Sequence, residues 1–158
     1  MAKYYIAYGS NLNVRQMRHR CPGALVVGTG FIKDYELLFK GSKTGSYLTI
    51  EEKTGCSVPV AIWKVNEEHE QALDVYEGYP TFYYKKEMEM DYISIKSKIA
   101  HHVKAFVYIM HEDRKLGIPS IEYVRVCLEG YRTFGFNQKY MEVAIKKSME
   151  VQHGNKSN

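Results

Sequence analysis

The order of the predicted elements constrains the fold most, because strand-like segments come first and helices come mainly last. Short runs rich in aromatic and β-branched residues, which favour β-strands, recur through the first two thirds of the chain. They span 4–8, 24–31, 35–40, 47–52, 58–65, 82–93 and 102–110. Helix-forming sequence then covers 120–134 and 137–149. This order predicts one α+β domain, for which a closed or strongly curved sheet is one arrangement.

Turn signals between these runs predict how the strands connect. We expect Lys33-Asp34 to join the strands at 24–31 and 35–40, and residues 41–45 to form a turn. The segment 53–55 is expected to be the turn of a hairpin made by the strands at 47–52 and 58–65.

Two helices are predicted within the strand-rich part of the chain. A short helix at 13–20 begins at Asn13 and ends before Pro22. A longer helix begins at Asn66, has acidic residues in its first turn, and ends at Gly78, where a glycine commonly ends a helix. We expect residues 1–150 to form the domain and residues 151–158 a disordered tail.

Composition narrows the class of protein. The chain is 45% apolar and 25% charged, which is typical of soluble globular proteins. Its net charge of +4 is not gathered in a basic block, so we predict no nucleic-acid partner. No apolar run approaches the length of a membrane span, and the three cysteines show no CxxC spacing. We therefore predict a cytoplasmic protein without a membrane partner, and make no prediction of oligomeric state.

Tyrosine supplies 14 of the 158 residues, against 6 Phe and 1 Trp. A buried tyrosine needs a partner for its hydroxyl group, so this excess indicates a pocket or a polar-lined interior.

The segment Tyr8-Gly9-Ser10-Asn11-Leu12 lies between a predicted strand and a predicted helix. Glycine permits close backbone approach, and the amides of such a turn can bind a carboxylate or an oxyanion. The alternative is an ordinary strand-to-helix turn.

Glu77 is the last residue of the helix predicted from Asn66. The negative end of the helix dipole raises the pKa of a carboxyl group that is also shielded from water, and such a group can act as a general base near neutral pH. The alternative is a solvated glutamate at a helix end. Phe82 and Tyr84 share one face of the next predicted strand, where a ring could cover Glu77 or pack in the core.

Other catalytic motifs are missing from the sequence. The histidines are dispersed, and adjacent His101 and His102 face opposite sides of a strand, so we predict no metal. Ser10 lacks a GxSxG motif, and Gly28-Thr29-Gly30 precedes no nucleotide-binding pattern. We predict no cofactor.

Several of these segments together resemble the γ-glutamylcyclotransferase-like family. They are YGSNL at 8–12, the strands ending YLTI and VAIWKV, LDxYEGYPxxY from Leu73 to Tyr84, and, near the C-terminus, Gly130-Tyr131 with Gly135-Phe136-Asn137 and Tyr140. The resemblance covers nearly the whole chain. It implies a mixed, barrel-like β-sheet with flanking helices, whose pocket has the turn at 8–12 as its floor.

The resemblance also implies roles for particular residues. Glu77 matches the family's catalytic glutamate, Tyr8 to Leu12 match its substrate-binding loop, and Tyr84 matches a pocket tyrosine. The implied reaction is intramolecular cleavage of a γ-glutamyl amide to 5-oxoproline and a free amine, without a metal or cofactor. Asn11 differs from the residue found in the glutathione-specific branch.

Three alternatives remain beside this interpretation. The chain could trim a γ-glutamyl group from a biosynthetic intermediate or a modified lysine. It could instead sense a γ-glutamyl metabolite without catalysis, although a sensor needs no buried base. Nucleic-acid binding through the positive surface would be strongly salt-dependent.

Overall fold

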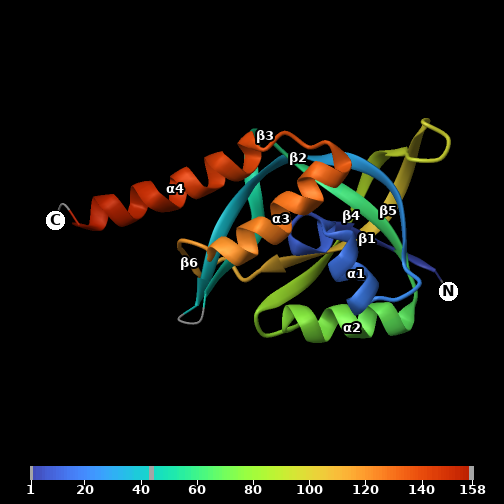
Figure 1. Ribbon diagram of the computed structural model, residues 1–158, viewed down its shortest axis with the longest axis horizontal. Helices are drawn as coiled ribbons and strands as arrows, with labels where there is room; N and C mark the ends of the chain where they lie inside the picture. Colours follow the sequence, from blue (N-terminus) through green and yellow to red (C-terminus); the bar gives the residue numbers. More distant parts are fainter. Residues whose placement is uncertain (1, 43–44, 157–158) are drawn as a thin grey trace.

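A computed structural model describes residues 2–42 and 45–156. The protein is built around a closed β-barrel that contains both parallel and antiparallel strand pairs (Figure 1). Its strands are β1 (Lys3–Ala7), β2 (Leu25–Ser42), β3 (Gly45–Val65), β4 (Tyr83–Ser94) and β5 (Ala100–Met110). They follow one another in the order β3, β1, β5, β4, β2, and pairing of β2 with β3 closes the ring. β1 and β5 run parallel, and the other described pairs are antiparallel. The expected α+β domain with a barrel-like sheet is confirmed.

The predicted hairpin within residues 47–65 is wrong, because β3 is one continuous strand. β2 is likewise continuous through the expected joint at Lys33-Asp34. The two pair along nearly their whole lengths, with an irregularity between Lys33 and Tyr35. There Asp34 adopts a φ of 63° and its Oδ1 accepts a hydrogen bond from the Gly55 amide at 2.9 Å. The turn signals therefore mark a bulge rather than chain reversals.

The predicted turn at 41–45 falls where β2 gives way to β3. Ser42 ends β2 and Gly45 begins β3, and residues 43 and 44 lie outside the described residues. A short strand that the sequence did not signal, β6 (Lys115–Leu116), pairs with the last part of β2.

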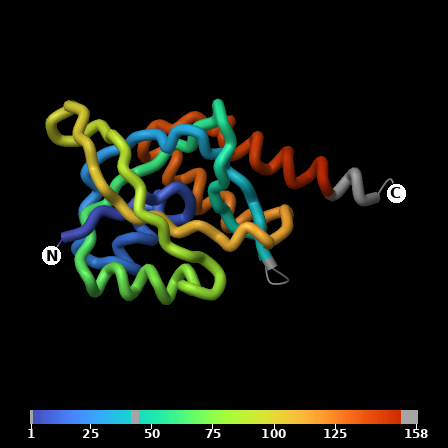
Figure 2. The backbone as a smooth tube through the Cα atoms, turned by 180° about the vertical axis from the view of Figure 1, so that it is seen from behind, coloured from blue at the N-terminus to red at the C-terminus, as the bar shows by residue number. Residues whose placement is uncertain are grey.

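The described chain has four α-helices, which Figure 2 shows from behind: α1 (Val14–Arg20), α2 (Glu67–Glu77), α3 (Ile121–Phe134) and α4 (Lys139–Lys156). In Figure 1, α2 lies beside α1 along one side of the barrel, α3 crosses it, and α4 extends beyond it. The first three match the predicted helices, whereas α4 continues past the predicted end at Met149 into the segment that we expected to be disordered. None of the described helices is long and apolar enough to cross a membrane.

Local sequence explains both ends of α2. At its start, the Asn66 side chain accepts a hydrogen bond from the His69 amide at 2.9 Å, and His69 Nδ1 accepts one from the Asn66 amide at 3.1 Å. At its end, Gly78 adopts a left-handed conformation with a φ of 64°. These two signals fix Glu77 as the final helical residue.

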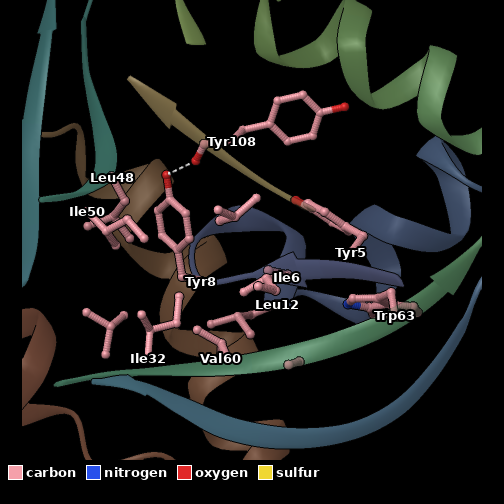
Figure 3. Packing of buried hydrophobic residues seen from close by; sticks show 14 of the residues in the cluster. Tyr5, Ile6, Tyr8, Leu12, Ile32, Leu48, Ile50, Val60, Trp63 and Tyr108 are labelled. Carbon is pink, nitrogen blue, oxygen red and sulfur yellow. Dashed lines mark hydrogen bonds between the residues drawn. The ribbon is translucent and has the colours of Figure 1, made fainter. Parts of the chain in front are cut away.

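The barrel interior forms the core, and Figure 3 shows part of its packing. Ile6, Leu12, Val60 and Ile62 are fully buried. Leu12 belongs to a 3₁₀ turn, η1 (Ser10–Leu12), which connects β1 to α1. The turn is thus packed into the core.

Gly130 of α3 lets this helix approach η1 closely. A Cβ atom at Gly130 would lie 2.5 Å from Leu12 Cβ and 2.6 Å from the Leu12 carbonyl carbon. Alanine in a helix interior is ordinarily about 1 kcal/mol more favourable than glycine. Here we expect Gly130→Ala to destabilise the protein by about 1–3 kcal/mol, because the backbone of η1 must move. Urea denaturation measures this difference.

Arg132→Ala is the matched control, because Arg132 lies on the exposed side of the same helix. It should change the free energy of unfolding by less than about 0.5 kcal/mol. A Gly130→Ala protein as stable as the parent would mean that α3 and η1 are not in this close contact.

Candidate functional site

A pocket of about 330 Å³ opens between η1, the C-terminal end of α2 and one part of the barrel wall. Tyrosines dominate its lining, as the composition suggested. The lining residues are Tyr5, Tyr8, Gly9, Ser10, Asn11, Tyr47, Leu48, Tyr76, Glu77, Phe82, Tyr83, Tyr108 and Tyr123.

The turn at one side of the pocket leaves backbone donors without a partner in their own helix. In η1 the Leu12 amide donates to the Gly9 carbonyl at 3.0 Å, and the Asn13 amide donates to the Ser10 carbonyl at 3.0 Å. The first amides of such a turn, those of Ser10 and Asn11, have no carbonyl within the turn to bind. They are available for an anionic group in the pocket.

Glu77 supplies the one carboxyl group among the lining residues. Burial raises the pKa of Glu77 to about 7, and the nearby Arg20 cation opposes part of this rise. Within the described residues, no hydrogen bond or ion pair engages this carboxyl group. A carboxyl with these properties can accept and return a proton near neutral pH.

Tyr76 connects the end of α2 to the turn. Its hydroxyl group and the Ser10 hydroxyl form a hydrogen bond of 2.9 Å. The Arg20 guanidinium lies over the Tyr76 ring, 3.3 Å from its centroid. Because Tyr76 directly precedes Glu77, these contacts hold the carboxyl group beside η1.

Arg20 also fixes the side chain of Asn11. Its Nη1 donates to Asn11 Oδ1, and its Nη2 donates to Gln16 Oε1 at 3.0 Å. The opposite end of the Asn11 amide, Nδ2, donates to the Tyr5 hydroxyl at 2.8 Å. Asn11 is 2% exposed and Tyr5 is 3% exposed, so the hydrogen bond between these two side chains is buried.

Three other pocket tyrosines donate their hydroxyl protons to acceptors in the protein. Tyr8 donates to the Tyr108 carbonyl at 2.7 Å (Figure 3), and Tyr83 donates to the Leu48 carbonyl at 2.8 Å. Tyr108 donates to Asp74 Oδ1 of α2 at 2.6 Å. These bonds tie β3, β4, β5, α2 and the residue after β1 together in the pocket wall.

Five of the seven residues that the resemblance assigned to the site lie together in this pocket: Tyr8, Gly9, Ser10, Asn11 and Glu77. Two do not line it. Leu12 points into the core, where it is fully buried. Tyr84 donates its hydroxyl to Glu112 Oε2 away from the lining, because successive side chains of β4 alternate and its neighbour Tyr83 takes the inward position.

Phe82 does line the pocket, although it does not share a strand face with Tyr84 as expected, since β4 begins one residue later, at Tyr83.

Sequence reasoning missed several lining residues and Arg20. Tyr5 had an available signal, because it lies three residues before Tyr8 in the same aromatic run. Tyr108 and Tyr123 had none, since they come from β5 and α3, far along the chain from η1. Only the closed barrel brings them to the turn.

Among the described residues, no group of three or more His, Cys, Asp or Glu side chains is arranged to hold a metal ion. His102 does contact two carboxylates, Asp91 at 2.8 Å and Glu89 at 3.4 Å, but these are exposed ion-pair contacts and the three side chains are not arranged as metal ligands.

The fold and pocket define a class of protein: a small β-barrel whose tyrosine-lined pocket joins a carboxyl of raised pKa to a turn with available amides. Residues 5–125 match the family described as gamma-glutamyl cyclotransferase, AIG2-like. The chain belongs to this γ-glutamylcyclotransferase-like family, as its motifs suggested. The matched region contains every lining residue of the pocket.

Curated mammalian relatives carry the name gamma-glutamylcyclotransferase. The human protein is 29% identical over 149 residues, which cover 87% of this chain and 74% of that protein. The mouse protein is 26% identical over 145 residues, with the same coverage of each chain.

Solved structures agree on the fold. A structure titled gamma-glutamyl cyclotransferase is 24% identical, covers 91% of this chain and 86% of that one, and superposes with a TM-score of 0.75. A yeast enzyme described as specific to glutathione is 11% identical, with a TM-score of 0.55 over 97% of this chain and 100% of that one.

Proposed function

We propose that this protein cleaves γ-glutamyl amides by intramolecular ring closure, releasing 5-oxoproline and a free amine. The observation that carries the proposal is the placement of Glu77, with its pKa of about 7, in the same pocket as the amides of η1. Membership of the γ-glutamylcyclotransferase-like family supports the same reaction class.

Glu77 acts as general base and then as general acid. The nucleophile is the α-amino group of the substrate, which is protonated at neutral pH and must lose a proton before it attacks the γ-carbonyl carbon. Glu77 accepts that proton. A carbon–nitrogen bond to the α-amino nitrogen forms, the attacking nitrogen releases its second proton to solvent water, and the original amide bond breaks. Glu77 returns a proton to the leaving nitrogen, which makes an amine a better leaving group.

The turn at η1 binds the glutamyl end of the substrate. The amides of Gly9, Ser10 and Asn11 hold the α-carboxylate, a full charge that identifies the glutamyl group, and Tyr8 lies next to them in the pocket. Binding folds the glutamyl chain so that its amino group lies near the γ-carbonyl carbon. Such intramolecular reactions reach effective molarities of about 10⁵ M or more, so the chain needs no nucleophile of its own.

A screen of γ-glutamyl amines and γ-glutamyl amino acids tests the proposal. Mass spectrometry should detect 5-oxoproline and the free amine in equal amounts for at least one compound. If 5-oxoproline raises the thermal stability of the protein while none of the compounds is turned over, the protein is a sensor instead.

The pH dependence of kcat/KM should follow the free Glu77 carboxyl group. Since only the ionised form accepts a proton, kcat/KM should rise with pH and level off above a midpoint of about 7. Initial rates from about pH 5 to pH 8 measure this profile. A midpoint near the ordinary glutamate pKa of 4.5 would exclude the shielded carboxyl group as the base.

A further inference from the structure

One buried hydroxyl group in the pocket has a proton that the described protein does not use. The Tyr5 oxygen accepts a hydrogen bond from Asn11 Nδ2 at 2.8 Å. A tyrosine hydroxyl carries one proton to donate as well as lone pairs to accept. Within residues 2–42 and 45–156, no acceptor takes the proton of Tyr5.

The orientation of the Asn11 amide determines this arrangement. Arg20 has only donors, so its contact with Asn11 fixes Oδ1 on the side of the guanidinium and Nδ2 on the side of Tyr5. Nδ2 is a donor and cannot accept the Tyr5 proton. The Tyr5 O–H bond is therefore free to point away from Asn11, into the pocket that Tyr5 lines.

Tyr5 and Glu77 line the same pocket. Burial raises the pKa of Tyr5 and Tyr8 well above the usual value, and the charge of Glu77 is the strongest influence after burial on both. Both hydroxyls thus stay protonated at neutral pH. Tyr8 has already donated its proton to the Tyr108 carbonyl, so Tyr5 is the donor of this pair that a substrate can use.

We propose that the Tyr5 hydroxyl donates a hydrogen bond to the γ-carbonyl oxygen of the substrate and stabilises the oxyanion that forms on it, with Asn11 and Arg20 as positioning residues. The proposal rests on the proposed function. Glu77 must reach the attacking and the leaving nitrogen, both bonded to the γ-carbon in the tetrahedral intermediate. A donor that lines the same pocket as Glu77 can therefore reach the oxygen on that same carbon, where negative charge grows during attack.

Tyr5→Phe tests the proposal, because it removes the hydroxyl and keeps the ring that packs 5.4 Å from Phe106. Loss of one oxyanion donor typically lowers kcat by about 10² to 10³-fold. We expect a loss of that size in 5-oxoproline release with KM nearly unchanged, since the oxyanion exists only after attack. An unchanged kcat, or a loss confined to KM as expected for an α-carboxylate contact, would overturn the proposal.

Tyr131→Phe is the matched control. Tyr131 is fully buried on α3, outside the pocket lining, and its hydroxyl has no hydrogen-bond partner within the described residues. Removing it should leave both kcat and KM as in the parent protein. A fall in kcat equal to that of Tyr5→Phe would show that loss of any buried hydroxyl disturbs the site, and would also overturn the proposal.

A double-variant cycle tests the positioning role. In Asn11→Asp the side chain can no longer donate to Tyr5 but can accept its proton, so the hydroxyl turns away from the substrate. Tyr5→Phe combined with Asn11→Asp should therefore lower kcat much less than the product of the two separate losses. Independent, multiplied losses would contradict the positioning role.

The experiments distinguish an error in the role of Tyr5 from an error in the proposed function. A parent protein that forms 5-oxoproline, together with a Tyr5→Phe protein of equal kcat, rejects only the role of Tyr5. A parent protein that forms no 5-oxoproline from any γ-glutamyl amide rejects both.

Discussion

Glu77→Gln should lower the rate of 5-oxoproline release by about 10² to 10⁴-fold, the usual contribution of one acid–base group. The amide has nearly the same size as the carboxyl group but can neither accept a proton from the α-ammonium group nor return one to the leaving nitrogen. Because the substitution leaves the pocket lining in place, 5-oxoproline should still bind. Single-turnover rates with the best substrate measure the loss.

Glu68→Gln is the control for this substitution. Glu68 lies in the first turn of the same helix and is exposed, so its replacement changes the net charge equally without reaching the pocket. Its rate should equal that of the parent protein. Activity that survives Glu77→Gln would reject Glu77 as the base.

The second large effect concerns stability: Glu77→Gln should lower the reaction rate but raise the free energy of unfolding at neutral and higher pH. The pKa of Glu77 is raised from 4.5 to about 7 in the folded protein. Between these values the folded state binds the proton more tightly than the unfolded state, so this group stabilises the fold at low pH. That contribution disappears as pH rises through about 7, where the buried carboxyl must ionise.

Glu77→Gln removes the loss of stability that comes from ionising this carboxyl group as pH rises. Relative to the parent protein, the variant should gain about 2–3 kcal/mol of unfolding free energy between about pH 5 and pH 8, since one pKa unit corresponds to about 1.4 kcal/mol. Urea denaturation of both proteins at the two pH values measures the difference. A constant difference between them would mean that the carboxyl group is not shielded. The gain would identify Glu77 as a residue that lowers stability in the ionised form needed for the reaction.

The sequence predicts the helices well because each carries its own signals. Asn66 and Gly78 mark the ends of α2, and so place Glu77 correctly. The same local reasoning fails for the long β2 and β3 strands, since Asp34 and Gly55 are turn-forming residues that the barrel uses for a bulge. A turn-forming residue permits certain backbone angles, but whether the chain reverses there depends on which strand it pairs with.

The candidate residues that share one pocket are those whose positions are set by local sequence. Tyr8 to Asn11 and Glu77 come together as the resemblance implied, because η1 and the end of α2 are both locally encoded. Tyr84 lies outside the pocket lining because its neighbour Tyr83 takes the inward position on β4, and its role as a pocket tyrosine stays a prediction from the resemblance. The aromatic run at 4–8 drew attention to the region of Tyr5, but the free proton of its hydroxyl depends on the contacts of Asn11 with Tyr5 and Arg20, which only the folded chain shows.

The central claim is that the substrate's own amino group, and not water, attacks the γ-carbonyl carbon with Glu77 as the base. Turnover in water labelled with oxygen-18, followed by mass spectrometry of the product, tests it most directly. Ring closure incorporates no solvent oxygen, so the 5-oxoproline released together with the amine should be unlabelled. Glutamate carrying one labelled oxygen would show that water is the nucleophile and would contradict the account.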